Sequence, residues 1–102
     1  MSPKLFEYNG IVLRFYSNDH LPVHVHAIYS NTHGAKVELI QQNGKIVEVI
    51  YKKIKGYKAL EPKQLKDLNK LIEKYAPVII ENWIDYFVSG KTNIKTKKIT
   101  KL

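Results

Sequence analysis

The sequence predicts an α+β fold, in which a four-stranded, mainly antiparallel sheet is followed by two C-terminal helices packed on one face. Two observations support this class. The first half of the chain holds short β-rich runs separated by turn residues, and the second half carries an apolar stripe at helical spacing. With 102 residues the chain suffices for one core. We therefore expect residues 1–102 to form a single domain, with 1–9 and 91–102 as flexible or edge segments.

The four expected strands are residues 11–16, 23–29, 35–40 and 45–51. The last two flank Asn43-Gly44, a pair that tolerates positive φ and strongly favours a tight hairpin. In residues 23–29 valine and alanine alternate with histidine. Because side chains two apart on a strand point the same way, His24 and His26 are expected to share the face opposite the core.

The two expected helices are separated by Pro77. The first begins after Glu61-Pro62, where a proline in the first turn loses no hydrogen bond. Its apolar stripe contains Leu65, Leu68, Leu71, Ile72 and Tyr75, and its opposite face carries Lys63, Lys66, Lys70 and Lys74. The second is expected over residues 78–89, ending at Gly90. A charged helix face is usually only solvated, although this one also suits nucleic acid or an acidic partner.

Composition excludes several function classes. The chain has no cysteine, which rules out disulfides, thiolate zinc sites and cysteine nucleophiles. It has no Gly-rich phosphate loop, which rules out nucleotide hydrolysis of the P-loop type. No apolar run approaches the roughly 20 residues of a membrane span. We expect a cytoplasmic protein with no membrane partner.

The charge balance points to an anionic partner. Lys and Arg number 17 against 9 Asp and Glu, which gives a net charge of +8. Arg14 is the one arginine among these bases. Its planar fork pairs bidentately with phosphate, which a lysine cannot do, so Arg14 is a candidate phosphate clamp; a single arginine kept by chance is the alternative.

The candidate site is the histidine-rich segment. All four histidines fall between His20 and His33, and three of them lie in the string Asn18-Asp-His-Leu-Pro-Val-His-Val-His26. We expect His20, His24 and His26 to be the catalytic residues with Arg14. The expected substrate-binding residues are Asn18, Asp19, Lys52, Lys53 and Lys55.

These residue types suit three functions. Imidazoles exchange protons near neutral pH, so with a phosphate clamp they suit RNA cleavage that needs no metal or other cofactor. Alternatively, His20, His24 and His26 can ligate zinc, as in a small metal-dependent hydrolase. In the third case the histidine face is a non-enzymatic binding surface for a partner protein. Tyr51 and Tyr57, set among lysines, are a candidate base-stacking pair.

The chain also resembles a known bacterial family. The similarity is carried by residues 10–16, by Asn18-Asp-His20, Pro22 and His24-Val-His-Ala27, and by Glu81-Asn-Trp83 and Gly90. These residues resemble the family called domain of unknown function 4160, over about residues 5–102. Members are small prokaryotic proteins, often encoded beside a protein of the domain of unknown function 2442 type, and some are regarded as toxins. The resemblance implies a toxin-like protein with a cognate small antitoxin-like partner. Together with the histidine cluster, Arg14 and the net charge of +8, it leads us to expect a toxin-like component that acts on or binds RNA.

Overall fold

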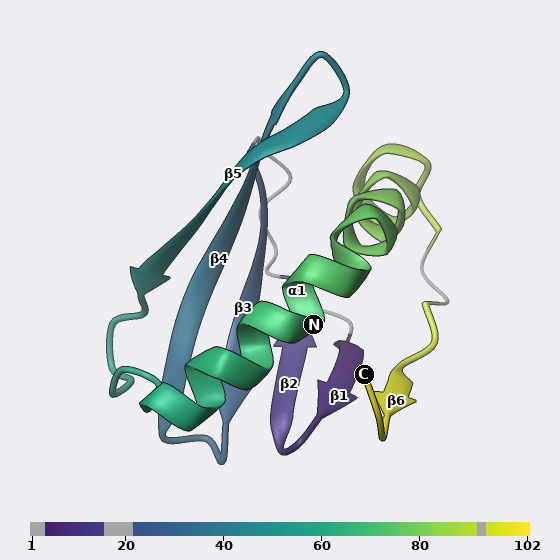
Figure 1. The fold of residues 1–102 in the computed structure, drawn as a ribbon. Helices are drawn as coiled ribbons and strands as arrows, with labels where there is room; N and C mark the ends of the chain where they lie inside the picture. Colours follow the sequence, from purple (N-terminus) through teal and green to yellow (C-terminus); the bar gives the residue numbers. More distant parts are fainter. Residues whose placement is uncertain (1–3, 16–21, 92–93) are drawn as a thin grey trace.

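The computed structural model describes residues 4–15, 22–91 and 94–102 (Figure 1). Its sheet has six strands. These are β1 (Lys4–Tyr8), β2 (Ile11–Arg14), β3 (Val23–Tyr29), β4 (His33–Gln42), β5 (Lys45–Lys53) and β6 (Lys97–Ile99). Their order in the sheet is β5-β4-β3-β2-β1-β6. Every pair is antiparallel except β1 with β6, so the sheet is mixed.

The expected four-stranded sheet was therefore wrong. Sequence reasoning did not predict the strand β1, which lies between β2 and β6 and whose register with β2 shifts between Lys4 and Phe6. This irregularity buries the adjacent Leu5 and Phe6 together, so β1 lacks the alternation that marks a half-buried strand. At the sheet edge, β6 lies within residues 91–102, which were expected to be flexible or an edge segment, and it buries only Ile99.

The expectation of two C-terminal helices was also wrong, because one helix continues through Pro77. The helix α1 (Pro62–Trp83) passes into a single π-helical turn, η1 (Ile84–Val88). A proline inside a helix costs roughly 3 kcal/mol, whereas each large apolar side chain gains roughly 1.5–3 kcal/mol on burial. Buried residues lie on both sides of Pro77, among them Leu71 and Ile79. The burial of apolar side chains before and after Pro77 therefore outweighs the backbone hydrogen bond that the proline removes.

Replacing Pro77 with alanine should stabilise the protein. The position is exposed, and alanine restores the backbone donor, so we expect the free energy of unfolding to rise by about 1–3 kcal/mol. Urea unfolding measures the change, with the exposed Val78→Ala as the control that leaves the backbone donors unchanged. A loss of stability in Pro77→Ala would contradict this expectation.

The core lies between α1 and one face of the sheet (Figure 1). Strand residues that alternate with polar ones are fully buried there, including Leu13, Val25 and Val37, together with Leu68 and Leu71 of α1. At the start of α1, the backbone N–H of Glu61 donates to the side-chain oxygen of Gln64. In the described part of the chain, no helix has the length and apolarity needed to cross a membrane.

Tight hairpins fix the register of the strands. Asn43 and Gly44 both have positive φ, at 54° and 78°, as expected for the turn between β4 and β5. Asn9 and Gly10 do the same between β1 and β2, at 49° and 83°. A two-residue turn sets which residues stand opposite each other beside it, and the register shifts at Lys4/Phe6 and Ile40/Gln41 set the pairing farther along these two hairpins.

Candidate functional site

A row of basic side chains crosses the side of the sheet that faces away from α1. The register places Lys4 opposite Arg14, Arg14 opposite His26, His26 opposite Lys36, and Lys36 opposite Lys52. We call these five residues the cationic row. Neighbouring strands lie about 4.8 Å apart, so the row spans about 19 Å. The pairing of β2 with β3 thus brings Arg14 next to His26, which the sequence alone left open.

Glu38 is buried beside this row. Its carboxylate oxygens lie 3.4 Å from Nζ of Lys36 and 3.2 Å from Nζ of Lys52. Burial raises the pKa of Glu38, but the hydrogen bonds and charges of Lys52, and then of Lys36, lower it further than burial raises it, so the net pKa lies below its ordinary value. Glu38 thus fixes the two lysines in place and offsets part of their charge.

His24 and His26 share one face, as the alternation predicts, with ring centroids 6.3 Å apart. Both side chains are buried, although α1 lies on the other side of the sheet. Nδ1 of His24 lies 3.1 Å from the carbonyl oxygen of Pro22. A carbonyl only accepts, so Nδ1 donates and, in the neutral ring, Nε2 keeps the lone pair.

His26 is electrically neutral at neutral pH. Burial, followed by the charges of His24 and Lys36, lowers the pKa of His26 from 6.5 to about 4. A neutral imidazole cannot donate the proton that a general acid must supply, and one with a pKa near 4 is a weak base. The catalytic roles of His24, His26 and Arg14 stay predictions, and the geometry suits His26 better to binding.

A hollow of about 550 Å³ lies at the Lys4 and Arg14 end of the cationic row. Lys4, Arg14 and His26 line it from one side. Val12 and Ile28, which stand opposite each other on β2 and β3, give it an apolar lining, and Tyr57 lines it from the loop after β5. None of the described residues that line the hollow carries a carboxylate.

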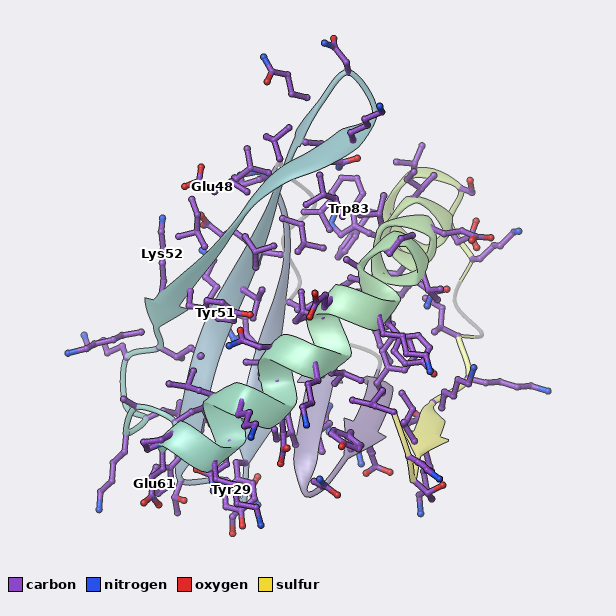
Figure 2. The ribbon with its side chains drawn as sticks, in the orientation of Figure 1. Tyr29, Glu48, Tyr51, Lys52, Glu61 and Trp83 are labelled. Carbon is purple, nitrogen blue, oxygen red and sulfur yellow. The ribbon has the colours of Figure 1, made fainter. Side chains whose placement is uncertain are left out.

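The three lysines expected to bind substrate lie in three different positions in the structure. Lys52 belongs to the row, and in Figure 2 its side chain projects away from α1. Lys53 stands opposite Ala35, a core residue, so it belongs to the other face. Lys55 lies past the end of β5.

The two tyrosines expected to stack bases as a pair lie on different sides of the sheet. Tyr51 donates a hydrogen bond to the side chain of Asn69 on α1 (Figure 2), whereas Tyr57 lines the hollow. Each of the two residues is 37% exposed. Only Tyr57 lies near the cationic row.

Three of the expected site residues, Asn18, Asp19 and His20, lie outside the described residues. Within the residues that are described, no group of three His, Cys, Asp or Glu side chains is arranged to hold a metal ion. The alternative zinc set includes His20, so zinc binding by His20, His24 and His26 stays a prediction.

Sequence reasoning missed Lys4, Lys36 and Glu38. Lys36 and Glu38 alternate with Ala35, Val37 and Leu39, so the pattern that placed the histidines on one face could have placed these two as well. Lys4 had no such signal, because the irregular register of β1 hides its strand.

The fold and the site define a small α+β protein with a helix on one face of a mixed sheet and a basic surface on the other. The chain belongs to the family described as "Domain of unknown function (DUF4160)", whose model matches residues 10–84. The matched region includes β2 to β5 and the whole of α1. No curated protein and no solved structure matches the chain.

Proposed function

We propose that this protein binds RNA through the cationic row and acts as the toxin-like component of a two-component module. The observation that carries the proposal is the row itself, in which Lys4, Arg14, Lys36 and Lys52 are drawn from four strands into one line beside His26. A line of cations matches the repeated phosphates of a nucleic acid strand, and phosphate contacts supply most of the affinity of sequence-independent binding.

Binding is favoured over cleavage by the state of His26. Cleavage without a metal needs one group to take a proton and another to give one near neutral pH. With the pKa of His26 lowered to about 4, this residue does not fill the second role in the free protein. A neutral imidazole still donates one hydrogen bond and accepts another, which suits contacts to a phosphate oxygen or a ribose hydroxyl.

The Arg14→Gln variant tests the binding function. We expect the affinity for a single-stranded RNA of about ten nucleotides to fall by on the order of tenfold, because a hydrogen bond to a charged group contributes roughly 1.5–3 kcal/mol. Arg14→Lys should fall between wild type and Arg14→Gln, since it keeps the charge but loses the fork. Fluorescence anisotropy at several salt concentrations measures this, and gel analysis of the same samples detects cleavage. Equal affinity for all three proteins would contradict the role of Arg14.

The toxin role and its partner have their own test. They are supported by the family resemblance, which implies a neighbouring small protein of the domain of unknown function 2442 type as the antitoxin. Induced expression in bacteria should slow growth for wild type and less for Arg14→Gln, and co-expression of the neighbouring protein should restore growth. Unchanged growth with intact RNA binding would remove the toxin role and leave the binding role standing.

A further inference from the structure

We propose that the hollow beside Arg14 takes one unpaired nucleotide of a single-stranded RNA, with its base against Tyr57 and its phosphate between Lys4 and Arg14. This inference, which rests on the RNA-binding function proposed above, names the form of RNA and the position of one base.

The lining of the hollow matches the parts of a nucleotide. Its volume of about 550 Å³ lies in the range of small-ligand sites, roughly 300–1,000 Å³. Lys4 and Arg14 offer positive charge for a phosphate, and Val12 and Ile28 offer an apolar surface for a flat ring. The described lining residues include no carboxylate to repel the phosphate. A site for a bare anion would need the positive charges but not the apolar lining that Val12 and Ile28 provide.

Tyr57 is held at the hollow by backbone hydrogen bonds on both sides. Its own N–H donates to the carbonyl oxygen of Ile54 at 3.1 Å. The N–H of Lys58 donates to Thr32 at 2.9 Å, and the carbonyl of Lys58 accepts from Gly34 at 2.9 Å. These bonds tie the loop to the start of β4, so little conformational freedom is lost when a base stacks on the ring. The residue is 37% exposed, which leaves part of the ring accessible.

An unpaired base is required because a base inside a duplex is stacked on both faces. The A-form helix of double-stranded RNA is recognised through its shape, its phosphates and its 2′-hydroxyls, whereas unstacked bases of single strands can be placed on aromatic side chains. The other cations of the row, Lys36 and Lys52, lie along the sheet from the hollow and can follow the phosphates of the same strand.

The test compares three RNA probes with four proteins. The probes are an oligouridylate of about eight nucleotides, an abasic strand of the same length, and a duplex of the same length. The proteins are wild type, Tyr57→Ala, Tyr57→Phe and Tyr51→Ala. Tyr51 is the matched control, since it is equally exposed but faces α1. Circular dichroism and thermal unfolding establish that each variant is folded, and Tyr57→Phe provides the comparison if Tyr51→Ala is unstable.

We expect wild type to bind oligouridylate about tenfold more tightly than the abasic strand or the duplex, since stacking of one base contributes roughly 1–3 kcal/mol. Tyr57→Ala should lose this preference, while Tyr57→Phe and Tyr51→Ala should keep it. If Tyr57→Ala weakens both strands equally, or wild type binds the abasic strand equally well, the nucleotide site is overturned and RNA binding by the row is not. If wild type binds none of the probes, the proposed function fails and this inference fails with it.

Discussion

Replacing Lys4, Arg14 and Lys36 together with glutamine should weaken binding to single-stranded RNA by at least about a hundredfold at low salt. Each replaced side chain removes one positive charge from the cationic row. Lys52 is retained on purpose, because its Nζ lies 3.2 Å from Glu38 and so the buried carboxylate keeps a partner. The slope of log affinity against log salt should become shallower by about 2, because each of the three lost phosphate contacts contributes roughly 0.7 to the slope on a single strand.

The matched control removes the same charge from the other side of the molecule. Lys63, Lys66 and Lys70 are exposed residues of α1, and their replacement with glutamine lowers the net charge by the same amount. We expect this variant to lose much less affinity than the row variant. Equal losses would show that overall charge, and not the row across the sheet, attracts the RNA.

Acid should destabilise the protein between about pH 6.5 and pH 4 through His26. Burial and the charges of His24 and Lys36 lower the pKa of His26 from 6.5 to about 4. In this interval the unfolded chain holds a proton that the folded protein does not, so stability falls as the pH falls and levels off below the folded pKa. A shift of this size corresponds to about 3 kcal/mol.

Urea unfolding at pH 7 and at pH 4.5 measures this loss, and an NMR titration of the His26 ring follows the proton directly. His26→Gln should lose much less stability between these two pH values, because no imidazole remains to be protonated. His33→Gln, which removes a histidine outside the cationic row, is the control. A flat profile for wild type, or the same loss in His26→Gln, would contradict the assignment.

The effect of Glu38 on stability falls in a lower pH range than the effect of His26, so the two effects can be measured separately. The pKa of its carboxyl lies below the ordinary value of 4.5, so its contribution to stability is present above that value and is lost as the pH falls through the folded pKa. The ion pairs with Lys36 and Lys52 that cause the lowering are the same contacts that hold the two lysines in the row.

The part of the site that follows strand alternation could be predicted from the sequence. His24 and His26 were placed on one face because a period of two residues is intrinsic to the strand. Arg14 was placed on the neighbouring strand, but its position opposite His26 depends on the pairing of β2 with β3, which a shift of one residue would reverse.

The errors in the fold came from residues whose local signal opposed the tertiary packing. Pro77 disfavours a continuous helix, yet burial of Leu71 and Ile79 on either side of it keeps α1 on the sheet. In β1 the adjacent Leu5 and Phe6 are both buried, so no alternation marks the strand. Lys4 and its place in the row could not be predicted without that strand.

The cationic row has one residue from each of β1 to β5, so no continuous peptide carries it. A chain still being synthesised holds Lys4, Arg14 and His26 well before Lys52, and all five residues stand in line only after β5 has paired with β4. Binding capacity is thus expected to arise late, in one step with the completed sheet, and bound RNA in turn should stabilise the whole sheet against unfolding.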